Sequence, residues 1–175
     1  MFFSKSKRKE IRNINQIIKD QDIEELFKCS DSGDFTIALF EILSNQFDGD
    51  PTKMNLVQQN LFLSIWLENY GQSDTIYTFL EEEYPSYSNE VINGLREIGA
   101  LKSSEIIKQS VNLLHEKGSF FSENLDENSC NLLTKYNDEF SSYPDGRLDC
   151  LYRKYAEVNK IELIKNLSFK NNERR

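Results

Sequence analysis

The sequence is poor in the residues on which many recognisable active sites depend. It contains one histidine, His115, and three widely spaced cysteines, Cys29, Cys130 and Cys150, with no CxxC pair. One histidine excludes His-rich zinc sites and the carboxylate–histidine bundles that need two. Scattered cysteines in odd number are typical of reduced, mostly buried thiols in a cytosolic protein. We therefore expect no metal site and no cofactor.

Glycine and proline are also scarce, with 7 and 3 copies in 175 residues. A β-rich domain of this length needs many turns, which favour these two residues, so their scarcity favours helices. The patterns GxGxxG, GxxxxGK[ST] and GxSxG do not occur. No apolar run approaches the roughly 18 residues of a membrane span, and no apolar segment follows the first charges as in a secretory signal. These absences predict a cytoplasmic protein that is not an enzyme of a recognisable class.

Positive charge is concentrated at the two ends of the chain. Residues 1–12 have five basic side chains and one acidic one, a net charge of +4, and residues 165–175 have four and one, a net charge of +3. Because the whole chain carries −8, residues 13–164 carry −15. We predict a basic, frayed segment 1–12, an acidic all-helical domain 13–164 and a basic, flexible tail 165–175. Such a body repels nucleic acid and attracts basic proteins, although negative charge also simply keeps proteins soluble.

Apolar residues recur at helical spacing along most of the chain, and no segment alternates long enough for a strand. The second half of residues 55–70 is apolar nearly all round, which predicts a central core helix with Trp66 buried and Gly71 at its end. Residues 67–114 predict three helices, interrupted at residues 84–85 (Tyr-Pro) and at Gly99. The sequence therefore predicts an all-α, single-domain irregular helical bundle of about seven or eight helices.

Polar residues at the predicted helix ends indicate caps and turns. Asp22, Asp34 and either Ser73 or Asp74 are expected to cap helices that start after them. Residues 48–51 (Asp-Gly-Asp-Pro) lack the acid spacing of a calcium loop, so we predict a turn there. A second turn is expected at residues 143–146 (Tyr-Pro-Asp-Gly). His115 is expected near a helix C-terminus, where a cation suits the helix dipole.

A set of acidic side chains lies between residues 74 and 97. Carboxylates three or four residues apart on a helix are roughly 5–6 Å apart, comparable to the spacing of successive phosphates on a DNA strand. Two such helices side by side would present a double row of negative charge, but on spacing alone solvated helix faces are the commoner explanation. The predicted partner-binding residues are Asp74, Glu81, Glu82, Glu83, Glu90 and Glu97.

Several short segments resemble the bacterial DNA-mimic protein domain family, a largely uncharacterised group. They include residues 67–71 (Leu-Glu-Asn-Tyr-Gly) and 95–100 (Leu-Arg-Glu-Ile-Gly-Ala), within a likeness over about residues 30–158. Residues 69–72 (Asn-Tyr-Gly-Gln) stand where the family usually has an Asn-Gly-Gly-Phe turn. The resemblance implies an all-helical, acidic and often dimeric protein. The best-described member of that family occupies the DNA-binding surface of a transcription regulator, but the resemblance alone does not transfer that partner to this chain.

Three functions remain open from the sequence. The first is a non-enzymatic interaction module that binds a basic protein, such as a DNA-binding regulator, by imitating phosphate charge. The second is an immunity protein that neutralises a toxin, for which the same acidic surface would serve if the toxin is a nuclease. The third is an enzyme of unrecognised type, which would require a pocket where acids, a tyrosine and His115 converge with shifted pKa values.

Overall fold

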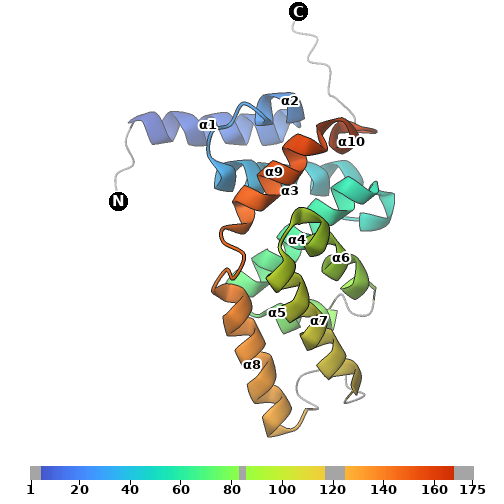
Figure 1. The fold of residues 1–175 in the computed structure, drawn as a ribbon. Coiled ribbons are helices and arrows are strands. Elements are labelled where there is room, and N and C mark those ends of the chain that lie inside the picture. The colour runs from blue at the N-terminus through green and yellow to red at the C-terminus, as the bar shows by residue number, and fades with distance from the viewer. Residues whose placement is uncertain (1–4, 83–85, 117–124, 168–175) are drawn as a thin grey trace, which may run out of the picture.

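The computed structural model describes residues 5–82, 86–116 and 125–167, and within them the side chains of 13–81, 86–114 and 125–167. These residues form ten α-helices and one 3-10 turn and contain no strand (Figure 1), which confirms the predicted all-α fold. The helix count exceeds the predicted seven or eight partly because the short α10 follows α9 after one residue, Asn159. The elements are α1 (Lys5–Asp20), α2 (Ile23–Leu26), α3 (Ser32–Phe47), η1 (Pro51–Lys53), α4 (Leu56–Ser73), α5 (Ile76–Glu82), α6 (Ser88–Ile98), α7 (Leu101–Glu116), α8 (Glu127–Ser141), α9 (Leu148–Val158) and α10 (Lys160–Ile164).

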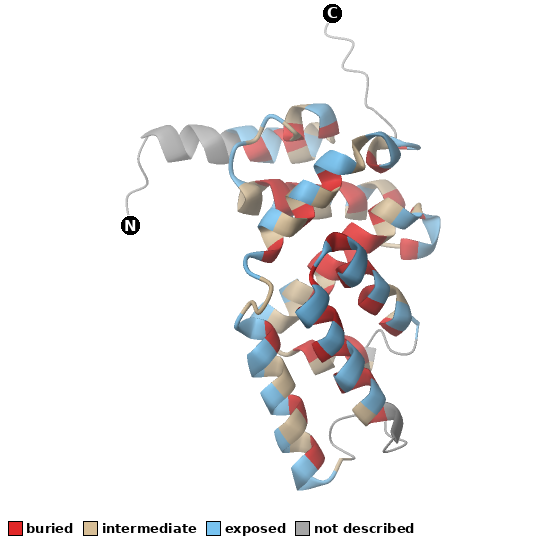
Figure 2. Cartoon of the chain, viewed as in Figure 1, coloured by how far each residue is buried: buried red, intermediate tan, exposed pale blue. Residues whose placement is uncertain are grey.

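Helix α4 is the central element of the fold. It packs against α3, α5, α6, α8, α9 and α10. In Figure 1 it runs between an upper group of helices, α1–α3 with α9 and α10, and a lower group formed by α5, α7 and α8. An unbroken run from Asn60 to Ile65 is buried, and buried residues face inward from both groups (Figure 2). The predicted position of this helix at the centre of the core is therefore confirmed.

Gly71 does not end α4, which continues to Ser73. A Cβ atom at Gly71 would lie 3.2 Å from Ile76 Cγ2 and 3.4 Å from a carbon of the Phe140 ring. The glycine therefore gives α5 and α8 room to approach the last turn of α4. Residues 69–72, which stand where the family usually has a turn, lie within α4.

Aromatic side chains form a row along one side of α4. The rings of Phe62 and Phe40 are stacked with centroids 5.0 Å apart. Trp66 continues the row to Phe79 of α5, with centroids 5.9 Å apart. Trp66 is partly rather than fully buried, because it lies at the edge of the core where Tyr70 also packs. The row connects α3, α4 and α5 through ring contacts. Such ring pairs stabilise a fold beyond the effect of the apolar area that they bury.

The helix caps confirm one sequence prediction and correct two. Asp22 caps α2, since its carboxylate accepts the Glu25 N–H at 2.9 Å. The cap of α3 is Asp31 rather than Asp34, which lies inside the first turn and donates its N–H to Asp31. Helix α5 starts after Thr75, whose hydroxyl accepts the Thr78 N–H at 3.2 Å, so neither Ser73 nor Asp74 is its cap. Helices α3 and α5 therefore begin one residue or more away from the expected place, whereas α2 begins where it was predicted.

The predicted turn at residues 143–146 is confirmed, and a side chain in this turn also caps α7. The Gly146 N–H donates to the Tyr143 carbonyl at 2.8 Å, and Gly146 has a φ of +85°. The Asp145 carboxylate in this turn accepts the backbone N–H groups of Lys102 and Ser103 at 3.0 and 2.7 Å. It thereby caps the N-terminus of α7 from a point 42 residues further along the chain.

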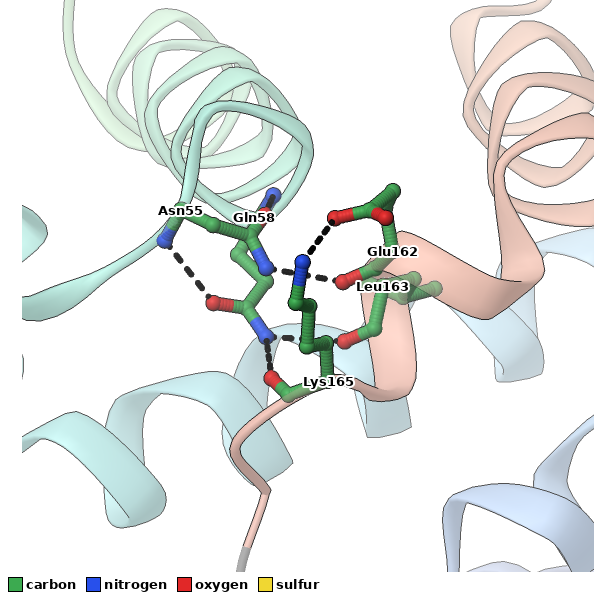
Figure 3. Close-up of polar contacts among 5 residues, drawn as sticks. All are labelled: Asn55, Gln58, Glu162, Leu163 and Lys165. Carbon is green, nitrogen blue, oxygen red and sulfur yellow. Dashed lines mark hydrogen bonds and ion pairs between the residues drawn. The ribbon is translucent and has the colours of Figure 1, made fainter.

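The start of α4 holds the C-terminal helix α10 (Figure 3). Asn55 and Gln58 form a capping box at the first turn of α4. The Gln58 Nε2 atom also donates to the carbonyls of Leu163 and Lys165 at 2.8 and 2.9 Å, and Asn55 Nδ2 donates to the Glu162 carbonyl at 2.7 Å. Two side chains at the start of α4 thus form hydrogen bonds with carbonyls at the end of α10 that have no partner within that helix.

The three cysteines form no disulfide with one another, and they are not mostly buried as predicted. Cys29 and Cys130 are partly buried, and Cys150 is exposed on α9, where Leu148 and Tyr152 take the inward positions. Within the described ranges, no group of three His, Cys, Asp or Glu side chains is arranged to hold a metal ion. None of the helices in those ranges has the length and apolar character needed to cross a bilayer.

Candidate protein-binding surface

The acidic residues predicted to bind a partner are distributed over the ends of α4 and α5 and along α6. Asp74 is exposed beyond α4, and its carboxylate accepts the Thr78 hydroxyl at 2.9 Å. Glu81 is partly buried near the end of α5. Glu90 lies partly buried in the first turn of α6, and Glu97 is exposed in its last turn. The Glu82 side chain and the whole of Glu83 lie outside the described residues.

The two helices that carry these carboxylates are attached to the bundle separately. Helix α6 packs mainly against α4 and α7, and α5 packs against α4, α7 and α8, rather than mainly against each other. The proposed double row of charge on two neighbouring helices therefore stays a prediction. Arg96 is exposed on α6 next to Glu97 and interrupts the negative charge there.

Small residues fix the position of α6. A Cβ atom at Gly94 would lie 3.2 Å from Ser64 Oγ and 3.3 Å from the Asn60 Cα and carbonyl oxygen, so α6 lies directly against the backbone of α4. The helix ends at Gly99, which has a φ of +95°, and the Ala100 N–H returns to the Leu95 carbonyl at 2.8 Å. The Leu-Arg-Glu-Ile-Gly-Ala element thus produces close packing and a sharp turn, not a reactive group.

A cavity of about 550 Å³ lies between α3, the second half of α4 and the start of α9, and the sequence did not predict it. Its polar lining converges on Glu68 of α4. The Gln72 amide donates a hydrogen bond to the Tyr143 hydroxyl, and the buried Tyr152 hydroxyl donates to the Ser64 carbonyl at 3.1 Å. The remaining lining residues are Gly33, Thr36, Ile37, Asn69, Arg147, Leu148 and Asp149.

The cavity perturbs the ionisation of its acidic groups. Burial raises the pKa of the Glu68 carboxyl, against the effect of hydrogen bonds from Tyr143 and Tyr152. Burial, followed by the negative charge of Glu68, raises the pKa of Tyr143 to about 12 and that of Tyr152 well above its usual value. Both hydroxyls are therefore protonated at neutral pH. Of the two, Tyr143 lines the cavity, where its hydroxyl can form a hydrogen bond to a ligand, whereas Tyr152 is fully buried and donates to Ser64.

An ion pair lies at the edge of this cavity. The Arg147 Nε atom lies 3.0 Å from Asp149 Oδ1, and its Nη2 atom contacts Oδ2. Desolvation is the largest effect on Asp149 and raises its pKa. The hydrogen bond and charge of Arg147, with the Cys150 N–H, outweigh it, so the pKa is lowered overall. The cavity thus already contains one guanidinium–carboxylate pair with two contacts.

The sequence comparison decides the family. A family model described as DMP19-like protein matches residues 52–164, which is well over half of the chain. The chain belongs to the DMP19-like family. DMP19 stands for DNA mimic protein 19, so the suspected resemblance to a DNA-mimic family is confirmed. Neither a curated protein nor a solved structure matches the chain.

The DMP19-like match begins at η1 and ends with α10, whereas the resemblance was expected over about residues 30–158. It therefore includes α4–α10 and leaves out α3. The cavity lies on this boundary, because Thr36 and Ile37 come from α3 and Glu68 and Asn69 from α4. Sequence reasoning missed it because its residues are spread over three segments. The only local signal is the acid Glu68 in an otherwise apolar stretch of the central helix.

Proposed function

We propose that this DMP19-like chain is a non-enzymatic, acidic interaction module that binds a basic DNA-binding protein and blocks the surface with which that protein contacts DNA. Membership of the DMP19-like family is the observation that supports this most strongly. The charge of the matched segment agrees with it. Residues 52–164 contain 18 acidic and 10 basic side chains, a net charge of −8.

The binding surface we propose includes Asp74, the run of Glu81, Glu82 and Glu83, and the α6 carboxylates Glu90 and Glu97. The exposed carboxylates among them, Asp74 and Glu97, can pair with lysine and arginine side chains at little cost in desolvation. A concentration of negative charge also accelerates encounter with a basic partner, and salt screens that attraction. The proposal therefore predicts binding that weakens steeply as ionic strength rises.

Replacing Glu81, Glu82 and Glu83 together by glutamine is expected to lower the association rate with the partner on the order of tenfold at low salt, because the variant loses three steering charges. The partner would be captured from the native host at low and high salt and identified, and its association then followed by surface plasmon resonance. Glutamine preserves side-chain size, so the melting temperature should change little.

A matched control removes three carboxylates from α3, α8 and α9, with the substitutions Glu41→Gln, Asp138→Asn and Glu157→Gln. It has the same net charge as the first variant and should bind the partner about as well as the unmodified chain does. Equal losses in both variants would show that net charge, not this surface, governs binding. Recovery of no basic protein, or binding that salt does not affect, would contradict the proposal. Recovery of a nuclease toxin would favour the immunity function instead.

We also propose that the chain forms a homodimer through apolar side chains beside α10. Val158, Ile161 and Leu56 are 77%, 81% and 68% exposed. They lie on helices that meet where Asn55 donates to the Glu162 carbonyl. Ile161→Asp is expected to give a monomer in light scattering at micromolar concentration, because a charge at an apolar interface is left unpaired. A monomeric unmodified chain would refute the dimer.

A further inference from the structure

Among the described residues, no cationic side chain pairs with the Glu68 carboxylate in the cavity. No ion pair among the described residues involves Glu68. The Tyr143 hydroxyl is its polar neighbour in the cavity, since the Tyr152 hydroxyl donates its proton to the Ser64 carbonyl. The charged group that acts on Glu68 is Asp149, and the Arg147 guanidinium, which also lines the cavity, is paired with Asp149. A partly buried carboxylate without a cation is costly unless a ligand supplies one.

The lining of the cavity fits a flat cation better than a compact one. Side chains of Ile37 and Leu148 offer apolar surface, while Asn69 and Gln72 add amide groups beside the Glu68 carboxylate. Thr36 contributes a buried hydroxyl that has no hydrogen-bond partner among the described residues. Guanidinium has flat, weakly hydrated faces and five N–H donors at its edge, whereas an ammonium group is compact and strongly hydrated.

A guanidinium group, that of Arg147, already lies at the edge of this cavity. The Arg147 side chain is 69% exposed and still contacts both carboxylate oxygens of Asp149. A second guanidinium entering from solvent would meet Glu68 as an acceptor that is not already paired with a cation.

We propose that the Glu68 cavity is a binding pocket for an arginine side chain of the protein partner. The guanidinium would pair with the Glu68 carboxylate, donate further hydrogen bonds to the amide oxygens of Asn69 and Gln72, and lie against Ile37 and Leu148. This deepens the proposed function, because it places one anchor residue of a basic partner in a defined cavity. Arginine is also, with tryptophan and tyrosine, enriched among the residues that contribute most of the binding energy in interfaces.

The test uses small probes and does not need the partner. N-acetyl-arginine methylamide should bind the full chain with a dissociation constant on the order of 1 mM, followed by NMR shifts of the Asn69 and Gln72 side-chain amides. The citrulline analogue, which is neutral and similar in shape, should bind at least about tenfold more weakly. The lysine analogue should also bind more weakly. Equal binding of the citrulline or the lysine analogue would overturn the proposal.

Glu68→Gln should abolish the preference for arginine over citrulline, whereas Glu41→Gln on α3 should leave it unchanged. Retained preference in Glu68→Gln would refute the pocket. If that variant unfolds, the pH dependence of the unmodified chain decides. The cation binds the ionised form of Glu68, so affinity should fall as pH decreases through the raised pKa of Glu68. Tyr143 and Tyr152 remain neutral there, while Arg147 and Asp149 keep their charges. Affinity that does not change with pH would also overturn it.

The two proposals fail independently. A basic partner that binds the chain normally, with no probe bound at Glu68, would overturn the arginine pocket and leave the proposed function standing. Probe binding at Glu68, with no basic partner recovered from the host, would overturn the proposed function and leave the pocket as a site for a cationic ligand.

Discussion

Replacing Gln58 by leucine is expected to lower the free energy of unfolding by about 3 kcal/mol. The Gln58 side chain is 1% exposed and makes three hydrogen bonds, from Nε2 to the Leu163 and Lys165 carbonyls and from the Asn55 N–H to Oε1. Leucine has a similar size but neither donates nor accepts, so these backbone groups lose their partner in a buried place. Urea denaturation followed by the fluorescence of Trp66, the only tryptophan, measures the effect.

The matched control for this variant is Gln109→Leu. Gln109 is exposed on α7, and its one side-chain contact, to Glu105, is long at 3.4 Å. Its replacement should change the free energy of unfolding by less than about 0.5 kcal/mol. A loss below about 1 kcal/mol for Gln58→Leu would mean that the contacts between α4 and α10 contribute little to folding. Faster proteolysis near residue 165 in Gln58→Leu would show that the loss is local to α10.

Gly94→Val is the second substitution for which we expect a large effect, a destabilisation of about 3 kcal/mol. Even a Cβ atom at this position lies 3.3 Å from the Asn60 backbone, and the branched methyl groups of valine would extend further into α4. Helix propensity alone favours valine over glycine. The loss would therefore measure the close approach of the two helices, because the local backbone preference acts in the opposite direction.

Asn93→Val, one residue earlier on the exposed side of α6, provides the comparison. It introduces the same side chain into the same helix without facing α4, and thermal unfolding should show little change. If both variants melt at the same temperature, the contact between α4 and α6 adapts to added volume. A native-like Gly94→Val would also weaken the explanation for glycine at this position.

Much of the fold could be predicted from the sequence because helical periodicity is a local signal. The apolar run that includes Trp66 predicted the central helix, and Gly99 predicted the break after α6. Gly71 was assigned to a helix end because glycine is common there. Its actual role depends on Phe140, which is 69 positions away and invisible to any local pattern. Asp31 and Asp34 lie three residues apart before and within the first turn of α3, so a local pattern could not show which of them is the cap.

The candidate site was less predictable because it depends on tertiary contacts. The acids between residues 74 and 97 could be named from the sequence, but whether they form one surface depends on how α5 and α6 are held. The convergence of Glu68, Tyr143 and Tyr152 joins residues up to 84 positions apart, and of the three only Glu68 stands out in its own segment. The change in the pKa values of these groups follows from burial, which composition does not reveal.

The hydrogen bond from Asn55 to the Glu162 carbonyl joins two segments that are far apart in the sequence (Figure 3). These two residues lie close to the two boundaries of the DMP19-like match, at residues 52 and 164. The first and last residues of the matched segment therefore lie close together in the fold. A unit with adjacent termini can be extended at either end, or inserted into a loop of another domain, without separating its helices. In this chain α1–α3 precede the matched residues, and α3 packs on α4 and α9 within the same core.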